Sequence, residues 1–504
     1  MTITLRDIEK ILKEHDLLKE FTYQSHWFYN LPVADRSLTH ITYDSRTVTP
    51  DSLFFCKGFG FKEAYLQKAM AEGLEVYVSE DVYDTEKGLG IIVTNVRQAM
   101  AVLSMAFYDN PQEKLTLIAY TGTKGKTTCA YFTKFILDHH TQQKTAIFST
   151  MNTSLDGKTY FKSALTTPES IDLYRMMQEA VDNGMTHLIM EVSSQAYKVE
   201  RVYHLMFDVG IFLNISPDHI SPIEHPTFDD YYYCKRQLIR HSKQMVLNVD
   251  CQDYALLKEM CEGYNVPYLS YGSQEKHPDV YWTQSSEDGL GFEVVTSTAS
   301  LPVNPSGNYR INLMGDFNKD NAVASILASQ LAGATVQEAQ QGLSEALVPG
   351  RMEQLTHSNG ARIFVDYAHN YVSLQQLLRF AKADTKGRII TVLGSPGDKS
   401  ISRRADFGHV LSELTDVVVL TADDPGHESP AAIAQEISAH ITNDKVVQIM
   451  VMEREEAIRR AIEMSEPGDA VIIAGKGRDA YQKVNGVDEP YPGDYTIAEG
   501  LIGK

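Results

Sequence analysis

Short apolar runs alternate with longer amphipathic stretches along most of this 504-residue chain. Runs that are apolar throughout are typical of buried strands, and amphipathic stretches are typical of helices. Strands that alternate with helices indicate parallel sheets covered by helices on both faces. In the first part of the chain the pattern predicts a helix at 62–72 and strands at 53–56, 75–78 and 90–94. In the second part it predicts strands at 144–149, 187–193, 207–215 and 244–249.

The last part of the chain has the same alternation, and it predicts a doubly wound, Rossmann-like sheet. Its expected strands are 362–367, 388–393, 416–421, 446–451 and 469–474. Ligands of such sheets bind beyond the carboxyl ends of the strands. Polar clusters follow four of these ends, at 366–369, 395–399, 423–426 and 475–479. The segment 280–315 differs, because its short runs are interrupted by Gly, Ser and Asn, which favours antiparallel strands.

A chain of this length is too long for one hydrophobic core. Pro111 with the polar residues after it, and Pro349 with Gly350, indicate two boundaries. We therefore predict an α/β protein of three domains, with the boundaries 1–112, 113–349 and 350–504.

Composition limits the partners and the location of the protein. The net charge of −20 argues against nucleic acid and against anionic membranes. No apolar run approaches the roughly 18 residues that span a bilayer, and the amphipathic N-terminus lacks the features of a signal peptide. Five cysteines without a CxxC pair favour reduced thiols over a disulfide framework or a zinc site. We expect a cytoplasmic protein with no nucleic-acid and no membrane partner.

The most informative segment is an apolar strand, 115–120, that leads into a glycine loop and then a helix. Backbone N–H groups of such a loop can surround phosphate at the helix N-terminus. Lys126 would reach the terminal phosphates of ATP, and Thr127 would offer its hydroxyl to Mg²⁺. The loop departs from the common eight-residue form, because Tyr120 stands where the first glycine is expected. The loop is Thr121, Gly122, Thr123, Lys124, Gly125, Lys126, Thr127 and Thr128.

Two further segments end apolar strands with groups that can hold a metal. Glu191 follows the strand at 187–190, and a carboxylate beside a phosphate loop can bind Mg²⁺ directly or through water. His219 follows Asp218 after the strand at 207–215. The alternatives are a solvated strand end for Glu191 and a structural role for His219.

Together these segments resemble the Mur ligases, the ATP-dependent amino-acid-adding enzymes of peptidoglycan synthesis. The resemblance extends over nearly the whole chain and includes the order of the motifs: 121–128, 191–194, 218–219, 314–318 with Asn321, 349–351 and 366–369. Within the family, Tyr43-Asp-Ser-Arg46 and Thr166-Thr-Pro168 are similar to the MurE type, which adds the third residue of the stem peptide to UDP-N-acetylmuramoyl-L-alanyl-D-glutamate.

The resemblance implies an N-terminal domain for the uridine nucleotide, a central ATP-binding domain and a C-terminal domain for the amino acid. It implies that the D-Glu γ-carboxylate becomes an acyl phosphate, from which an amine displaces phosphate. Residues implied to be catalytic are Lys126, Lys235, His219 and Glu191. Those implied to hold metal are Thr127, Glu191, His219 and Lys235, the last as a carbamate formed with CO₂. Besides the loop, those implied for ATP are Asn318, Asn321, Arg351 and Asp366. Those implied for the UDP-muramoyl dipeptide are Ser45, Thr166, Thr167, Ser193 and Arg201.

The added amino acid is expected to be L-lysine. In enzymes that add meso-diaminopimelate, an Asp-Asn-Pro-Arg motif grips the distal carboxylate, whereas this chain has Asp423, Asp424, Pro425 and Gly426. Loss of the arginine and gain of a negative charge disfavour a distal carboxylate. Asp479 could hold an amino group, and Lys399, Arg403 or Arg404 could bind the α-carboxylate.

Several alternatives remain at this point. L-ornithine is one methylene shorter than lysine, and one methylene gives only about 1–3 kcal/mol of discrimination. The same ligase could add meso-diaminopimelate. A folylpolyglutamate-synthase-like ligase would share the ATP loop, and a non-catalytic ATP-binding regulator would share only the nucleotide site. We expect a monomer whose partners are ATP, L-lysine and the UDP-muramoyl dipeptide.

Overall fold

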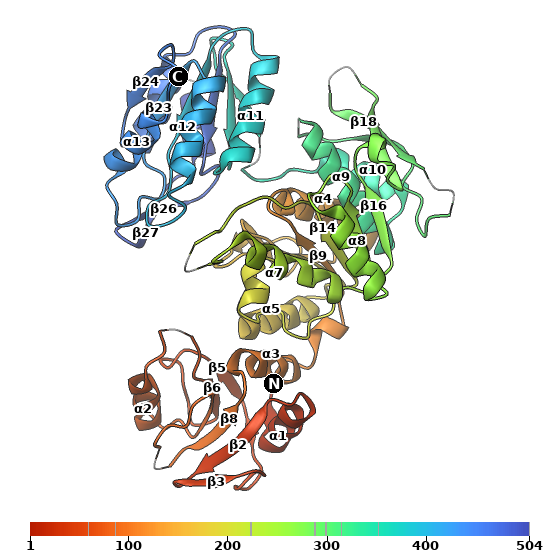
Figure 1. The fold of residues 1–504 in the computed structure, drawn as a ribbon, viewed down its shortest axis with the longest axis vertical. Coiled ribbons are helices and arrows are strands. Elements are labelled where there is room, and N and C mark those ends of the chain that lie inside the picture. The colour runs from red at the N-terminus through yellow and green to blue at the C-terminus, as the bar shows by residue number, and fades with distance from the viewer. Residues whose placement is uncertain are drawn as a thin grey trace. The chain divides into compact units, whose positions relative to one another are not determined.

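The computed structural model describes residues 1–58, 60–85, 87–221, 224–286, 289–297, 300–313, 315–350 and 352–502. The chain divides into two compact units, which are described separately here (Figure 1). The first unit comprises Met1–Ser285, Phe292–Arg310 and Asp320–Glu345. The second comprises Ser286–Gly291, Ile311–Lys319 and Ala346–Lys504.

The first unit begins with a six-stranded sheet in the order β3-β2-β8-β7-β6-β5. Strands β5 to β8 are parallel, and β2 is antiparallel to β8 and β3. The bounds are β2 (Leu18–Tyr23), β3 (His26–Phe28), β5 (His40–Thr42), β6 (Ser52–Phe55), β7 (Val76–Ser79) and β8 (Leu89–Val93). A separate pair joins β1 (Ile3–Thr4) to β4 (Ser37–Leu38).

Helices cover both faces of this first sheet. On one face, α1 (Leu5–Glu14) and α3 (Val96–Phe107) share a core with the strands. On the other face, α2 (Glu63–Ala71) packs on a smaller cluster. Local chemistry sets the helix starts, because Thr4 forms a capping box with Asp7 and the Asn95 side chain accepts two backbone N–H bonds at the start of α3.

The first unit also contains an eleven-stranded sheet, in the order β12-β11-β10-β13-β9-β14-β15-β16-β17-β18-β19. The central strands, β10, β13, β9, β14, β15, β16 and β17, are parallel to one another. On one side β11 and β12 pair antiparallel, and on the other side β18 does. The bounds are β9 (Thr116–Thr121), β10 (Thr145–Phe148), β11 (Asn152–Ser154), β12 (Phe161–Lys162), β13 (His187–Glu191), β14 (Val209–Phe212), β15 (Met245–Asn248), β16 (Tyr268–Tyr271), β17 (Val280–Gln284), β18 (Gly291–Thr296) and β19 (Gly307–Arg310).

Alternate residues of β9 show how this sheet is covered. Leu117 and Ala119 join the core formed with α5 (Ser170–Asp182), α7 (Phe228–Arg240) and α8 (Tyr254–Gly263). Tyr120 points to the opposite face, where its hydroxyl lies 2.5 Å from that of Thr133 on α4 (Lys126–Thr141). Helix α4 also packs against α10 (Val336–Glu345) and accepts a hydrogen bond from α9 (Asp316–Leu331). The short helix α6 (Ser194–Lys198) follows β13.

The second unit contains a six-stranded sheet in the order β20-β21-β25-β22-β23-β24, of which only β20 is antiparallel. Helices α11 (Tyr371–Asp384), α12 (Arg403–Leu414) and α13 (Pro430–Ala439) cover one face, and α14 (Arg454–Glu463) and α15 (Asp494–Leu501) cover the other (Figure 1). The bounds of the strands are β20 (Glu353–Thr356), β21 (Arg362–Asp366), β22 (Ile389–Leu393), β23 (Val417–Leu420), β24 (Val447–Met450) and β25 (Ala470–Ala474), with a hairpin of β26 (Tyr481–Val484) and β27 (Val487–Pro490).

The predicted α/β class is confirmed, and each predicted strand is present within a few residues of its expected ends. The antiparallel character of the segment 280–315 is also confirmed, by the pairing of β17 with β18. All five cysteines are buried and unpaired. Among the described residues, no helix is both long enough and apolar enough to cross a membrane.

Candidate active site

The glycine loop lies between the end of β9 and the start of α4, as the sequence predicts. Gly125 is the residue before the helix and has a φ of +84°, a conformation that favours glycine. A Cβ at this position would lie 2.5 Å from Asn321 Oδ1, so the loop also needs the absence of a side chain here. The loop therefore brings backbone amides to a helix N-terminus, where phosphate is bound.

Two lysines meet at one carbonyl group of this loop. Lys126 Nζ and Lys235 Nζ each donate to the Gly122 carbonyl oxygen at 2.8 Å. Lys235 lies on α7 and is 2% exposed. Burial lowers the pKa of Lys235 well below its usual value, and repulsion from Lys126 lowers it further. The arrangement thus favours a neutral amine on Lys235.

Glu191, at the end of β13, lies beside the first turn of α4. It is 1% exposed, and its Oε1 accepts a hydrogen bond of 2.8 Å from the Thr127 hydroxyl. Thr150 supports the same carboxylate, because its N–H donates to Oε1 at 2.8 Å and its hydroxyl to Oε2 at 2.9 Å. The three residues come from segments that the parallel pairing of β9, β13 and β10 brings together.

The Thr127 and Glu191 oxygens fit a magnesium site. Adjacent ligands of an octahedral Mg²⁺, each about 2.1 Å from the ion, lie about 3.0 Å apart. The observed separation of 2.8 Å between the Thr127 hydroxyl and Glu191 Oε1 agrees with that spacing. Both groups are hard oxygen ligands, as Mg²⁺ prefers.

The His219 side chain pairs with a carboxylate of its own segment. Its Nδ1 is 2.9 Å from Glu224 Oε1, and its side chain is 46% exposed. The neighbouring Asp218 instead pairs with Lys124 of the loop at 3.2 Å. The backbone of Lys124 is fixed by the Asn214 side chain at 2.9 Å. The segment after β14 therefore contacts the loop through Asn214 and Asp218.

The residues predicted for the muramoyl dipeptide gather beside Glu191. Thr167 Oγ1 donates to the Glu191 carbonyl oxygen at 3.0 Å and accepts from the Ser193 N–H at 3.0 Å. The hydroxyls of Thr166 and Thr150 are 3.1 Å apart. Arg201 donates to the Thr167 carbonyl oxygen at 3.3 Å. These predicted residues therefore form one continuous hydrogen-bonded group.

Ser45 lies in a loop of the first sheet that is held by its neighbours. Arg46 donates to both carboxylate oxygens of Asp44, among others through Nε to Oδ1 at 2.9 Å and through Nη2 to Oδ2 at 2.7 Å. These hydrogen bonds lower the pKa of Asp44 to about 2. The loop around Ser45 is thus ordered by an ion pair between its two flanking residues.

The other residues predicted for ATP occupy several environments. The side-chain oxygen of Asn321, on α9, lies next to Gly125 and 3.5 Å from Cys129 Sγ. In the second unit, Asn318 is buried, and Asp366 accepts a hydrogen bond from the Met352 N–H at 2.8 Å. Arg351 lies outside the described residues. The loop residues Thr121, Thr123 and Thr128 are buried.

In the second unit, the residues predicted for the amino acid surround a lysine. Lys476 is 1% exposed and pairs with Asp424 at 2.8 Å and with Asp479 at 3.2 Å. Burial raises the pKa of Asp423, although Lys476 opposes the shift. For Asp424, burial opposes but Lys476 prevails, so its pKa is lowered. The carboxylates of Asp424 and Asp479 thus already have a cationic partner, a pairing that the sequence analysis did not predict.

The rest of the 423–426 motif, Pro425 and Gly426, is fixed by close contacts with neighbouring segments. Gly426 has a φ of +59°, and a Cβ there would lie 2.1 Å from Asp398 Oδ2. The Gly426 N–H donates to the Lys483 carbonyl oxygen of the hairpin at 3.1 Å, and Pro425 precedes it. Arg404 is buried and bound to Glu428 and Glu436, at 2.9 and 2.8 Å, while Arg403 begins α12.

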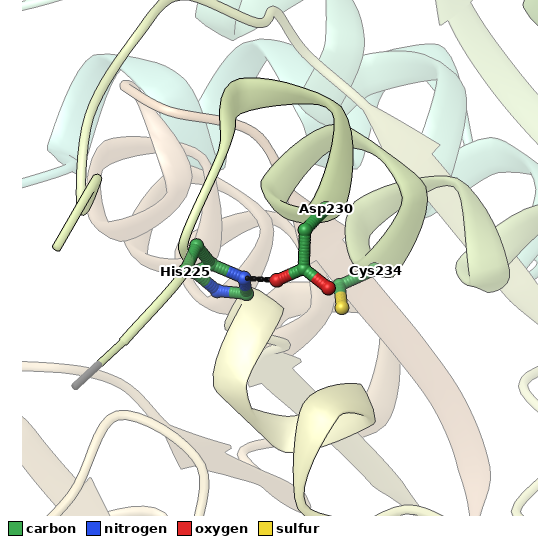
Figure 2. Close-up of side chains that lie close together, drawn as sticks. All are labelled: His225, Asp230 and Cys234. Atoms are coloured by element: carbon green, nitrogen blue, oxygen red, sulfur yellow. Dashed lines mark hydrogen bonds and ion pairs between the residues drawn. The ribbon is translucent and has the colours of Figure 1, made fainter. Parts of the chain in front are cut away.

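Sequence analysis also missed a group at the start of α7, which Figure 2 shows. His225, Asp230 and Cys234 bring possible metal-ligand atoms within 4.8 Å of one another. However, both ring nitrogens of His225 have partners: Asp230 Oδ2 at 2.6 Å and the Ser194 hydroxyl at 2.9 Å. Lys198, on α6, donates a hydrogen bond to the other carboxylate oxygen of Asp230 at 2.6 Å. The group therefore links α6 to α7 through hydrogen bonds. In the sequence, the only signal for this group is a histidine, His225, just before a predicted helix.

Comparison with known proteins places the chain in a family. Residues 120–329 match the Mur ligase middle domain, and residues 350–477 match the Mur ligase, glutamate ligase domain. The chain belongs to the Mur ligase family. A UDP-N-acetylmuramoyl-L-alanyl-D-glutamate--L-lysine ligase of Enterococcus faecalis is 59% identical to this Mur ligase over 100% of both chains. A ligase of the same name from Streptococcus thermophilus is 47% identical over 99% of this chain and 100% of its own.

Solved structures show the same fold for this Mur ligase. A UDP-N-acetylmuramoyl-L-alanyl-D-glutamate--2,6-diaminopimelate ligase matches with a TM-score of 0.66 and 22% identity, over 100% of this chain and 99% of its own. FolC of E. coli in complex with ADP matches with a TM-score of 0.59 and 16% identity, over 84% and 94%. The predicted three-domain α/β fold is confirmed, and the family implies ATP, Mg²⁺ and small-molecule substrates.

Proposed function

We propose that the chain is an ATP-dependent ligase that joins L-lysine to the D-Glu γ-carboxylate of UDP-N-acetylmuramoyl-L-alanyl-D-glutamate during peptidoglycan precursor synthesis. The observation that carries the proposal is the meeting of Lys126, Lys235, Thr127 and Glu191 at one phosphate loop. The names of relatives that match over their full length support the same substrates.

The chemistry needs a loop that positions a phosphoryl group and neutralises its charge. The D-Glu carboxylate attacks the γ-phosphorus of ATP, ADP leaves, and the amine of lysine then displaces phosphate from the acyl phosphate. In this proposal the loop amides and Lys126 bind the phosphates. Thr127 and Glu191 hold Mg²⁺, which offsets negative charge on the phosphates when bound. His219 is proposed as a ligand of a second ion.

Lys235 is proposed to carry a carbamate. Its neutral amine attacks CO₂, a nitrogen–carbon bond forms and one proton leaves. The product is an anion where an ammonium would face Lys126, with which it shares the Gly122 carbonyl oxygen. An anion at this position is compatible with a nearby metal ion, whereas a second ammonium is not.

The carbamate is tested with labelled CO₂ and a lysine variant. Carbon-13 NMR of the wild-type protein in ¹³CO₂ should give a carbamate signal that Lys235→Ala lacks. Lys235→Ala should also lose activity and regain part of it with short carboxylates. The exposed Lys243, which pairs with Asp208, supplies the matched control Lys243→Ala. A signal that persists in Lys235→Ala would rule out the assignment.

The preference for L-lysine is proposed on the charge of the residues predicted to bind the amino acid in the second unit, which we call the acceptor group: Asp423, Asp424, Asp479 and Lys476. Asp423, Asp424 and Asp479 surround Lys476, Lys399 also lowers the pKa of Asp424, and Gly426 offers no cationic side chain. A distal ammonium of the substrate would meet this excess of carboxylates favourably, whereas a distal carboxylate would be repelled.

The experiment measures phosphate release with lysine, ornithine and meso-diaminopimelate side by side. Release should require both the UDP-muramoyl dipeptide and an amino acid, which separates a ligase from a regulator that only binds ATP. Lysine should give the highest kcat/KM, ornithine a value lower by about 10- to 100-fold for one methylene, and diaminopimelate a still lower value. Equal rates with lysine and diaminopimelate would contradict the proposal.

The remaining assignments are part of the same proposal. Ser45 is assigned to the uridine nucleotide, and Asn318, Asn321, Arg351 and Asp366 are assigned to ATP. The domain boundaries 1–112, 113–349 and 350–504 are retained. A monomer in the cytoplasm, without nucleic-acid or membrane partners, is proposed on the net charge of −20 and on the small size of the substrates.

A further inference from the structure

A hairpin of β26 and β27 lies against the 423–426 motif of the second unit. Its strands are joined by Asn485 and Gly486, whose φ angles are +49° and +78°. Two residues with positive φ between paired strands form a type I′ turn, the connection that suits the twist of a hairpin. Hydrogen bonds join the pair of residues that closes such a turn but not the next pair along the strands. Lys483 belongs to that next pair, so its N–H and carbonyl group point away from β27.

Lys483 uses these two groups to bind the motif. Its N–H donates to Asp424 Oδ1 at 2.9 Å, and its carbonyl oxygen accepts from the Gly426 N–H at 3.1 Å. The Asn485 N–H donates to the Gly426 carbonyl oxygen at 2.7 Å. The Gln482 side chain donates to the carbonyl oxygen of the first residue of the motif at 2.6 Å. These hydrogen bonds make β26 an added strand beside the motif, and one of them reaches a carboxylate of the acceptor group.

The hairpin itself lies at the surface. Strand β27 is exposed along its length, and Val487 is 63% exposed. Among the described residues, those at 481–490 take no part in the two hydrophobic clusters of the second unit. An isolated two-stranded hairpin is only marginally stable in water, so the contacts with the motif help to hold it in place. The hairpin can therefore be altered with little effect on the core of the sheet.

These contacts bear on the length of the amino acid rather than on its charge. The acceptor group disfavours a distal carboxylate, but lysine and ornithine carry the same charge and differ by one methylene. Discrimination by one methylene requires that the binding groups stay within about 0.5 Å of one position. Asp424 Oδ1 is held from two sides, by the Lys483 N–H and by Lys476 Nζ at 2.8 Å. The hairpin thus supplies one of the two contacts that fix this oxygen.

We propose that the β26–β27 hairpin is a specificity-determining element, which holds the Asp424 carboxylate at the position that fits a lysine side chain better than an ornithine side chain. This inference rests on the proposed function, because it takes the substrate and the acceptor group from it. Lys483 acts through Asp424, so it is a positioning residue. The competing explanation is that the hairpin only covers the motif, in which case its alteration weakens the binding of both amino acids equally.

The main experiment compares two replacements of Lys483 in the full-length protein. Lys483→Ala removes the side chain, which pairs with Asp488 at 3.3 Å, and keeps the N–H. Lys483→Pro removes the N–H as well, at a strand position whose N–H does not bond to β27, where proline is tolerated. The KM for lysine should be about tenfold higher in Lys483→Pro than in Lys483→Ala, because a hydrogen bond to a charged group is lost. The ratio of kcat/KM for lysine to that for ornithine should fall about threefold or more. The KM for ATP should be the same in both variants.

Gln482→Met tests the hairpin without proline. It removes the donor to the Asp423 carbonyl oxygen and keeps a similar side-chain length. It should raise the KM for lysine about threefold and lower the lysine-to-ornithine ratio as well. Gln448 lies on β24 of the same unit and bonds to the Ser438 hydroxyl, so Gln448→Met is the matched control and should leave both values at wild type. Hydrogen exchange of β22 should match wild type in every variant, because the hairpin lies outside the hydrophobic clusters.

The outcomes separate the alternatives. An equal KM in Lys483→Pro and Lys483→Ala, or an equal loss for lysine and ornithine, would overturn the proposal in favour of a hairpin that only covers the motif. NMR of the Asp424 carboxyl carbon tests the contact without turnover. The pKa of Asp424 should be higher in Lys483→Pro than in Lys483→Ala, because the lost N–H bond no longer favours the carboxylate. The same pKa in both variants would also overturn the proposal. A changed pKa without lysine-dependent phosphate release would count against the proposed function alone.

Discussion

A buried ion pair next to the acceptor group allows a quantitative test of what stabilises the strand ends of the C-terminal sheet. Arg454 and Asp494 are 1% and 0% exposed, and Arg454 donates to both carboxylate oxygens, at 2.8 and 2.7 Å. The same guanidinium donates to the carbonyl oxygens of Ala422 and Ala474, at 3.1 and 2.8 Å. These two residues end the segments that lead to Asp423 and Gly475. The pair thus holds the ends of β23 and β25, the two strands on either side of β22.

Asp494→Asn removes the negative charge, keeps the side-chain shape and leaves a buried guanidinium without its counterion. Breaking such a pair by removing one partner costs about 3–5 kcal/mol. Because the two backbone carbonyls still accept hydrogen bonds, we expect the lower end, about 3 kcal/mol. Hydrogen exchange of β23 and β25 should report it as a loss of protection of about 100-fold, since 1.4 kcal/mol is a factor of ten.

A matched control lies on the same helix. Arg459, which is 35% exposed and pairs with Glu455 and Glu456, should cost less than about 1 kcal/mol when replaced by Met. The double variant Arg454→Met/Asp494→Leu should be less destabilised than Asp494→Asn, because it leaves no unpaired charge. A loss of protection below tenfold in Asp494→Asn would refute the reasoning.

Three further predictions concern the first unit. Gly125→Ala should raise the KM for ATP by tenfold or more, since its Cβ would lie 2.5 Å from Asn321 Oδ1, whereas Gly184→Ala, with a similar φ of +80° and open space, should leave it unchanged. Thr150→Val removes one of the hydrogen bonds to Glu191 and should raise the Mg²⁺ concentration needed for half-maximal phosphate release by about three- to tenfold; an unchanged requirement would contradict this role. Asp44 should titrate near pH 2 in NMR and return to about 4 in Arg46→Ala. Because its folded-state pKa is depressed, its contribution to stability is complete above pH 4 and is lost as the pH falls through about 2; a midpoint near 4 in the wild type would show that the ion pair is absent in solution.

The sequence was sufficient to predict features that depend on local pattern and on parallel sheet geometry. Strand ends followed by polar residues meet at one edge of a parallel sheet, so Glu191 was correctly expected beside the phosphate loop. The departure at Tyr120 also has a local cause. Strand β9 continues to Thr121, and the Tyr120 side chain is buried on the opposite face, bonded to Thr133, so the loop proper begins at Gly122.

Contacts between distant segments could not be predicted in this way. Lys57 and Glu169 pair with each other but are 112 residues apart, and no periodicity relates them. Lys476 was part of a predicted polar cluster, but its pairing with Asp424 depends on how the loops after β23 and β25 fold. A surface lysine and a buried one have the same sequence pattern when each follows a strand. Their burial is decided by side chains contributed from other elements.

The pairing of Lys476 changes the argument for lysine without reversing it. The sequence suggested that Asp424 is available to pair with a substrate ammonium. In the structure, Asp424 and Asp479 both already pair with the buried Lys476. With Asp423, three carboxylates lie around Lys476, and Lys399 is close enough to Asp424 to lower its pKa as well, which leaves a formal charge of −1 when all are ionised. Arg454 does not alter this balance, because Asp494 takes its charge. Burial raises the pKa of Asp423, whereas Lys476 lowers that of Asp424, so Asp423 loses its charge before Asp424 on acidification. A substrate ammonium would reduce the remaining repulsion among the carboxylates, whereas a substrate carboxylate would add to it, and the preference for a cationic side chain therefore follows from the whole group rather than from Asp424 alone.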